Sequence, residues 1–241
     1  MVSMPATLGP PPPAGHRINA APPRRHECPG AEPGLARQLA RRVLAEPWLA
    51  SALDAVTASG LPDAWIGAGV IRDVVWGQLH DGFDPALVRD VDVVFFDPGD
   101  LSPARDEAAQ RRLGELAGRP WEASNQAAVH TWFHDYFGGP PVPPFASVHE
   151  AVATWPETAT CVAVRRAPGD RAPGDLAPGD LAPGDRAPAG LEVCAPHGLA
   201  DLLGRTWRRN PVRVSLATSR ERLSRQRVAA RWPGVTIIPP E

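Results

Sequence analysis

Two aspartates separated by one residue stand at the start of an apolar run, Asp90-Val91-Asp92-Val93-Val94-Phe95-Phe96-Asp97. The β-branched and aromatic residues of this run predict a buried strand, and residues two apart in a strand point to the same face. The carboxylates of Asp90 and Asp92 are therefore expected side by side, where they repel each other unless a cation lies between them. Hard oxygen ligands of this kind suit Mg²⁺ or Mn²⁺. The spacing predicts a divalent-metal site.

A small-residue turn, Gly67-Ala68-Gly69, precedes the aspartates by about twenty residues. Residues 64–66 before it form a short apolar run, and residues 70–79 after it have helical spacing. Backbone N–H groups at such a turn are available to bind phosphate. Arg72 follows on the first turn of the helix, within reach of the same phosphate; a salt bridge with Asp73 or Asp90 is its alternative role. A phosphate-binding turn beside a metal site indicates metal-assisted nucleotidyl transfer.

Two other interpretations of these residues are open. A Gly-x-Gly turn before a helix, with an acidic residue about twenty positions later, also occurs in dinucleotide-binding folds. However, Arg72 stands where that motif has its third glycine. In addition, Asp90 and Asp92 lie at the start of their strand, whereas the ribose-binding acid of a dinucleotide-binding fold lies at the end of its strand. In the second interpretation, Asp90 and Asp92 are solvated residues at the start of a strand. Both are weaker than the metal-site interpretation.

The glycine turn followed by Asp-x-Asp resembles the signature of the DNA polymerase β-like nucleotidyltransferase superfamily. The segments WIGAGVIRDVVW, DVDVVFFDP, WEASNQAAVHTW and WPETATCVAV together are similar to a bacterial nucleotidyltransferase family that was long classed as a domain of unknown function. The resemblance covers roughly residues 49–238. The superfamily usually has a glycine followed by Gly or Ser, where this chain has Gly-Ala-Gly.

The resemblance implies a division of roles among these residues. Asp90 and Asp92 would hold the metal ions, and the backbone of residues 67–69 would cradle the nucleotide phosphates, with Arg72 beside them. A third carboxylate normally comes from a neighbouring strand, and Glu122 is the candidate because it follows a predicted helix over 102–117. Its role would be to complete the metal site and to take a proton from the attacking hydroxyl. A surface acid or a helix cap is the alternative for Glu122.

The implied reaction moves a nucleoside monophosphate from an NTP to a hydroxyl and releases pyrophosphate, with Mg²⁺ or Mn²⁺ as cofactor. A catalytically degenerate protein that binds nucleotide for regulation is the main alternative. The acceptor is open among a small molecule, RNA and protein, and no recognition of DNA sequence is expected. Residues 66–73 also resemble the opening motif of CCA-adding enzymes, which favours RNA, but the arginine-rich motif of those enzymes is absent. The corresponding stretch contains Asn125, Gln126 and His130. These residues either contact nucleotide or acceptor, or serve as a helix cap and a packed histidine.

The pattern predicts an α/β (α+β) fold in which a short mixed sheet carries the carboxylates on one face and helices cover the other. Residues 34–241 form one domain, which begins with helices over 35–44 and 48–58 and ends with a C-terminal β-hairpin and helical extension. The hairpin strands are 160–166 and 191–195. Between them, 167–190 contain four APGD repeats and are predicted to be a disordered insertion, and 1–33 a disordered Pro/Ala-rich tail.

Composition adds three limits. The chain has 241 residues, 43% of them hydrophobic, and a net charge of −2, so it can bury one sizeable core. No apolar run approaches the length of a membrane span and no secretion signal is apparent, so a soluble, cytoplasmic protein is expected. Its three cysteines lack metal-ligand spacing, and Cys161 and Cys194 are expected to be ordinary buried thiols. Arginines crowd residues 204–232, either as a polyanion site or as a solvated helix face.

Overall fold

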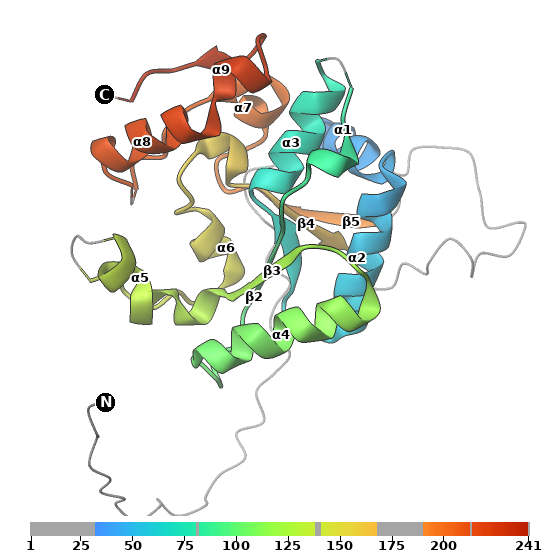
Figure 1. Cartoon of the computed structure of the whole chain (residues 1–241), viewed down its shortest axis with the longest axis vertical. Coiled ribbons are helices and arrows are strands. Elements are labelled where there is room, and N and C mark those ends of the chain that lie inside the picture. Colours follow the sequence, from blue (N-terminus) through green and yellow to red (C-terminus); the bar gives the residue numbers. More distant parts are fainter. Residues whose placement is uncertain (1–31, 81, 138–140, 168–189, 213, 241) are drawn as a thin grey trace, which may run out of the picture.

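The computed structural model describes residues 32–80, 82–137, 141–167, 190–212 and 214–240. A mixed sheet lies at its centre, with helices packed on both faces (Figure 1). In chain order the helices are α1 (Pro33–Leu44), α2 (Pro47–Ser59), α3 (Gly69–Gln78), η1 (Pro85–Leu87), α4 (Pro103–Leu116), η2 (Gln126–Ala128), α5 (Val129–Phe137), α6 (Val148–Val152), η3 (Thr158–Thr160), α7 (Ala200–Leu203), α8 (Leu216–Gln226) and α9 (Val228–Arg231). The strands are β1 (Trp65–Gly67), β2 (Val91–Phe95), β3 (Trp121–Asn125), β4 (Ala163–Arg166), β5 (Leu191–Cys194), β6 (Thr206–Trp207) and β7 (Thr236–Ile237).

The two N-terminal helices lie where the sequence predicts them. Proline occupies the first turn of both α1 and α2, a position where its missing N–H costs nothing. Gly60 ends α2 in the left-handed conformation, with φ of 70°, which a residue without a Cβ adopts at no steric cost. The chain then turns directly into β1 and so enters the sheet.

The central sheet has the strand order β3-β2-β1-β4-β5. Strands β2 and β3 are parallel, and the other neighbouring pairs are antiparallel, so the expected mixed sheet is confirmed. Strand β1 pairs with β2 in antiparallel fashion, with Trp65 opposite Val94. A dinucleotide-binding unit needs its first two strands to be parallel, because a crossover helix joins them on one face. The topology therefore excludes the dinucleotide interpretation.

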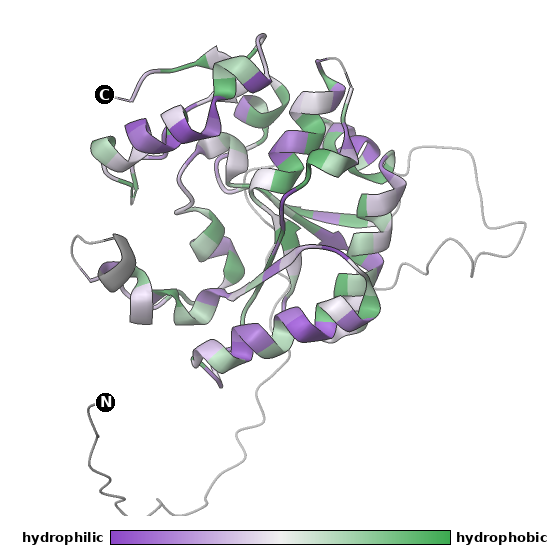
Figure 2. Cartoon of the chain, in the orientation of Figure 1, coloured by the Kyte–Doolittle hydropathy of each residue, from purple (hydrophilic) through white to green (hydrophobic). Residues whose placement is uncertain are grey.

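One face of the sheet carries the main hydrophobic core. Alternate residues of β2, namely Val91, Val93 and Phe95, are fully buried in it against α1 to α4. Trp76 of α3 is also fully buried and lies edge-on to Trp232 at 5.2 Å between ring centroids. Polar colour dominates α4 and α8 in Figure 2, in keeping with their mainly exposed surfaces.

The opposite face carries a smaller apolar cluster. Trp65, Val94 and Ala163 of the sheet pack there against Val148 and Val152 of α6. Asp92 lies on the same face as Val94, two residues earlier in β2. The carboxylate and the main helical layer thus lie on opposite faces as predicted, and the short helix α6 covers the apolar end of the carboxylate face.

The C-terminal half continues the fold as predicted, with a hairpin followed by helices. Strands β4 and β5 pair antiparallel, and Cys161 and Cys194 are buried free thiols. Residues 1–31 and 168–189 lie outside the described part of the chain, so the predicted tail and repeat insertion fall almost wholly there. Within the described ranges, no helix has both the length and the apolar composition needed to cross a bilayer.

Candidate active site

Asp92 lies at the centre of the candidate site. It is the second residue of β2, partly buried, and its carboxylate accepts a hydrogen bond from the backbone N–H of Gly69. The pKa of Asp92 is raised from 3.8 to about 7, first by burial and then by the negative charges of Asp90 and Glu122. The Gly69 hydrogen bond and the charge of Arg72 oppose this shift without cancelling it. A carboxylate held this way favours a proton or a cation as its partner.

Glu122 reaches the site through the parallel pairing of β2 and β3. In this register Asp92 is paired with Glu122, and paired residues of adjacent parallel strands point to the same face. Helix α4 supplies the connection, and the predicted start of the next strand near Glu122 is confirmed by β3. Glu122 is exposed, and both partial desolvation and the charge of Asp90 raise its pKa. The structure thus brings Glu122 to the two aspartates; its part in metal binding stays a prediction.

Asp90 differs from the expected strand residue. Strand β2 begins at Val91, so Asp90 precedes it by one position and is exposed. Across the described ranges, no three His, Cys, Asp or Glu side chains are already gathered as a metal-binding cluster. The donor chemistry nevertheless fits a divalent cation, because three carboxylates influence one another here and the buried one resists ionisation. Asp90 and Glu122 are exposed, so their side chains can change rotamer toward a cation at little cost.

The turn that the sequence predicts to bind phosphate contains Ala68 and Gly69. Ala68 has φ of 58° and ψ of −128°, a backbone conformation that glycine adopts far more readily than alanine. Its N–H donates to the carbonyl of Val162 at 3.1 Å, which fixes the turn to the rest of the sheet. A Cβ at Gly69 would lie 3.7 Å from Oδ2 of Asp92 and 3.8 Å from Nη2 of Arg72. Turn, carboxylate and guanidinium therefore meet at Gly69, at the start of α3.

Gly67 lies at a close packing contact in the structure. It is the last residue of β1 and is buried, and a Cβ at this position would lie 2.8 Å from the ring of Trp155 and 3.0 Å from Cβ of Ala163. Glycine is needed here because the tryptophan ring packs directly on the backbone. This packing explains Gly67 without a phosphate contact, which stays a prediction.

Arg72 is buried, with 5% of its surface exposed, and its partners are defined. Its Nε and Nη2 both donate to Oδ1 of Asp73, at 2.8 and 2.7 Å, so the alternative of a salt bridge with Asp73 is what the structure contains. The guanidinium lies 5.1 Å from the ring centre of Trp232 and 5.7 Å from that of Trp76. Its Nη1 donates to Oε1 of Gln226 at 3.5 Å. The charge of Arg72 lies near Asp92, but Asp73 largely balances it.

The three polar residues after β3 show mainly structural contacts. Asn125 is buried; its Oδ1 accepts from the N–H groups of Asp97 and Ala127, and its Nδ2 donates to two carbonyls. Gln126 donates to the backbone and hydroxyl of Ser124. Nδ1 of His130 is buried and has no hydrogen-bond partner within the described ranges. For Asn125, the cap is the role that the structure contains.

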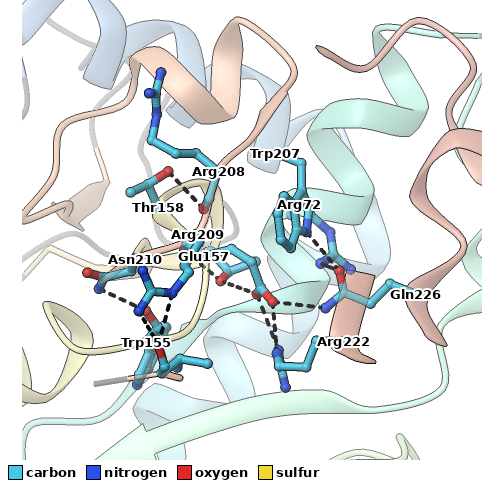
Figure 3. Close-up of polar contacts among 12 residues, drawn as sticks. Arg72, Trp155, Glu157, Thr158, Trp207, Arg208, Arg209, Asn210, Arg222 and Gln226 are labelled. Atoms are coloured by element: carbon cyan, nitrogen blue, oxygen red, sulfur yellow. Dashed lines mark hydrogen bonds and ion pairs between the residues drawn. The ribbon is translucent and has the colours of Figure 1, made fainter. Parts of the chain in front are cut away.

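Sequence reasoning assigned no role to Glu157, a residue central to this region. Glu157 is 1% exposed, and its two carboxylate oxygens bind Arg222 at 2.8 and 3.2 Å (Figure 3). Gln226 donates to the same carboxylate at 3.3 Å. The signal in the sequence is an acid within the apolar WPETATCVAV segment, together with Arg222 and Gln226 four residues apart on a predicted helix.

The crowded C-terminal arginines divide into two groups. Arg205, Arg208, Arg209, Arg222 and Arg231 bind carbonyls or carboxylates of the protein itself. Arg220, Arg225 and Arg227 are exposed. Much of the arginine excess therefore serves internal contacts, and the rest lies on the solvent side of α8 and its end.

Comparison with known proteins places this arrangement in a family. A family model described as nucleotidyltransferase matches residues 54–237, which is most of the chain. The chain belongs to the nucleotidyltransferase family. Its structure is similar to one whose solution study reported "a CCA-adding enzyme head domain", with a TM-score of 0.63 and 24% sequence identity over 84% of this chain and 95% of that one. No curated protein matches significantly.

The family and the fold together give this nucleotidyltransferase its general chemistry. The sequence resemblance implies a polymerase β-like nucleotidyltransferase fold, and the structure has this fold. General transfer of a nucleoside monophosphate, with an NTP as substrate, follows from the family, and nucleotidyltransferases of this kind generally use divalent metals. In this chain Asp92 is paired with Glu122 across β2 and β3, and the turn at Gly69 contacts Asp92.

Proposed function

We propose that this nucleotidyltransferase transfers a nucleoside monophosphate from an NTP to a hydroxyl group of an acceptor and releases pyrophosphate. One observation carries the proposal: Asp92 is partly buried against the N–H of Gly69 at the start of α3, and its carboxylate is influenced by both Asp90 and Glu122. A helix start that binds anions and a group of carboxylates that needs a cation thus lie together. Nucleoside triphosphate with its metal ions matches both. The expected compartment is the cytoplasm.

Asp90, Asp92 and Glu122 would hold the divalent cations, Mg²⁺ or Mn²⁺. When bound, such ions would neutralise negative charge on the triphosphate. They would also make the acceptor hydroxyl a better nucleophile and pyrophosphate a better leaving group. The buried position of Asp92 suits this role, because a carboxylate that is costly to ionise alone gains most from a cation.

The remaining steps belong to side chains and backbone of the protein. The N–H of Ala68 donates to the carbonyl of Val162 and that of Gly69 to Asp92, so the remaining N–H groups in the first turn of α3 would orient the phosphates. Arg72 would donate to a phosphate oxygen from Nη2, the nitrogen that lies beside Gly69. The acceptor oxygen forms a bond to the α-phosphorus while the bond to pyrophosphate breaks. Glu122 is a suitable base for the departing proton, since its raised pKa increases its basicity.

A second candidate is a nucleotide-binding protein without turnover. The exposure of Asp90 and Glu122, and the lack of a closed carboxylate cluster in the described ranges, favour it. The acceptor of an active enzyme would be a small molecule, RNA or protein. The similarity in fold to a CCA-adding enzyme head domain favours testing RNA first.

The test is pyrophosphate release by the purified protein. Each of the four NTPs is supplied with Mg²⁺ or Mn²⁺, alone and with pooled metabolites, RNA or protein as acceptor. Asp92→Asn is expected to lose at least a thousandfold in rate, as removal of a central metal ligand does, whereas Asp97→Asn keeps most of it. Asp97 is a matched control because it lies just beyond the same strand but binds Arg105 at 2.7 Å.

Two outcomes distinguish the candidates. Release that needs one acceptor fraction and vanishes in Asp92→Asn supports transfer and identifies the acceptor class. Metal-dependent NTP binding by calorimetry, with no release from any fraction, would instead support the regulatory alternative.

A further inference from the structure

Gln226, the last residue of α8, lies between the arginine of the candidate site and a buried acid (Figure 3). Its Oε1 accepts hydrogen bonds from Nη1 of Arg72 at 3.5 Å and from Nε1 of Trp207 at 3.2 Å. Its Nε2 donates to Oε1 of Glu157 at 3.3 Å. Because donors face the oxygen and a carboxylate faces the nitrogen, only one orientation of the amide satisfies all three contacts.

The side of this amide that faces Glu157 is firmly anchored. Glu157 is buried, and Arg222 binds both of its oxygens at 2.8 and 3.2 Å. The hydroxyl of Thr160, which is also buried, lies 3.2 Å from Oε2. A buried charge that is paired and hydrogen-bonded in this way holds its neighbours in one geometry. Glu157, next to η3, and Arg222 of α8 therefore hold Gln226 in place.

The other side of the amide contacts the guanidinium of Arg72. Asp73 binds Nε and Nη2, and the rings of Trp76 and Trp232 lie against the guanidinium. Nη1 has Gln226 as its hydrogen-bond partner. Nη2 then lies near Gly69, as Oδ2 of Asp92 does: a Cβ at Gly69 would be 3.8 Å from the first and 3.7 Å from the second.

We propose that Gln226 is a positioning residue for the transfer reaction: its bond to Nη1 sets the guanidinium of Arg72 so that Nη2 faces the turn at Gly69. The inference rests on the proposed function in one respect, that Arg72 binds a phosphate of the NTP. It makes the C-terminal helix α8 a working part of the active site, although α8 is more than 120 residues away from the aspartates in sequence.

The test begins with the position of Arg72, which does not depend on catalysis. Gln226→Met has nearly the same shape but offers neither acceptor nor donor. Thr160→Val is the matched control, because it removes a contact to Oε2 of Glu157, the oxygen that Gln226 does not bind, while Arg222 still holds the carboxylate and Gln226 still contacts Arg72. In protein labelled with ¹⁵N-arginine, the Nε–H resonance of Arg72 is assigned by its loss in Arg72→Lys.

We expect this resonance to shift and exchange faster in Gln226→Met and to stay in place in Thr160→Val. An unchanged resonance in Gln226→Met would overturn the inference. If Gln226→Met does not fold, Gln226→Asn replaces it: its amide is one methylene shorter and no longer reaches Nη1 of Arg72, so the resonance is expected to shift, and an unchanged resonance would equally overturn the inference.

A double-mutant cycle then asks whether the position matters for the reaction. Gln226→Met is expected to lower kcat/KM for NTP about tenfold, mostly through KM, as for one weakened hydrogen bond to a charged group. In the Arg72→Lys background, Gln226→Met should not lower kcat/KM any further, because Arg72, the residue through which Gln226 acts, is already replaced. A further tenfold loss there would show a general structural effect and overturn the inference. If the unmodified protein releases no pyrophosphate from any NTP, the proposed function fails, and the resonance of Arg72 alone decides the role of Gln226.

Discussion

Replacing Asp92 by asparagine is expected to make the protein more stable above neutral pH while it abolishes transfer. Asparagine has the shape of aspartate without its charge, and its Oδ1 can still accept the N–H of Gly69. The pKa of Asp92 rises from 3.8 to about 7 on folding, so between these two values the folded chain keeps a proton that the unfolded chain has lost. The stability of the unmodified protein therefore falls as pH rises through this window, and the full cost is present above pH 7.

The size of the effect follows from the shift in pKa. Three pKa units correspond to about 4 kcal/mol, which is an upper value because Asp92 is only partly buried. We expect Asp92→Asn to gain roughly 2–4 kcal/mol at pH 8.5, or about 5–10 °C in Tm for a domain of this size. The gain should shrink to about 0.5 kcal/mol near pH 4 and disappear below pH 3, where the carboxyl group of Asp92 is protonated in both the folded and the unfolded state.

The assay is urea or thermal unfolding of both proteins at several pH values in the presence of a chelator. Asp97→Asn is the control, and it is expected to lose up to about 1 kcal/mol with its ion pair to Arg105. Saturating Mg²⁺ at a hundred times its Kd should stabilise the unmodified protein by about 2.7 kcal/mol and leave Asp92→Asn nearly unchanged. A destabilised Asp92→Asn, or a gain that does not vary with pH, would refute the reasoning.

Three further substitutions test the local geometry by urea unfolding. Ala68→Gly should stabilise by about 1 kcal/mol, because it relieves a φ of 58° at an alanine, and a loss would contradict the assigned strain. Gly67→Ala should cost about 1–3 kcal/mol, because its Cβ would lie 2.8 Å from the ring of Trp155; a neutral result would show that the ring can move aside. Glu157→Gln should cost roughly 3 kcal/mol, because Arg222 loses its carboxylate, and a change below 1 kcal/mol would refute the assigned anchor.

Much of the central fold could be predicted because its signals are local. The turn at Gly67 to Gly69, the helix that follows it and the apolar run after Asp90 each have a period or composition that a short window reveals. Glu122 could be placed because it opens a strand directly after an amphipathic helix, and such a strand pairs with its predecessor. The face to which Asp92 points followed from strand alternation alone.

The contacts of the C-terminal half could not be predicted in the same way. Glu157 and Arg222 are 65 positions apart, and nothing in a local window indicates which arginine of a crowded segment turns inward. The interior contact of Arg222 depends on how α8 packs on η3, which is a property of the whole fold. A count of arginines predicted the positive charge of residues 204–232. It did not predict which of these arginines bind partners within the protein and which lie on the exposed surface.

Among the described residues, the partners of Arg72 explain why it forms no ion pair with Asp92. Asp73 binds Arg72 at 2.7 Å and Arg231 at 2.9 Å. Its negative charge therefore offsets much of the positive charge near α3 and weakens the effect of that charge on Asp92. Arg72 is accordingly the weakest of the influences on the pKa of Asp92, which stays at about 7 with an arginine close by. Had Arg72 bound Asp92 directly, that carboxylate would ionise readily and would attract a cation less strongly. By directing Arg72 to Asp73, the fold keeps the affinity of Asp92 for an incoming positive charge, as the proposed metal-dependent transfer requires.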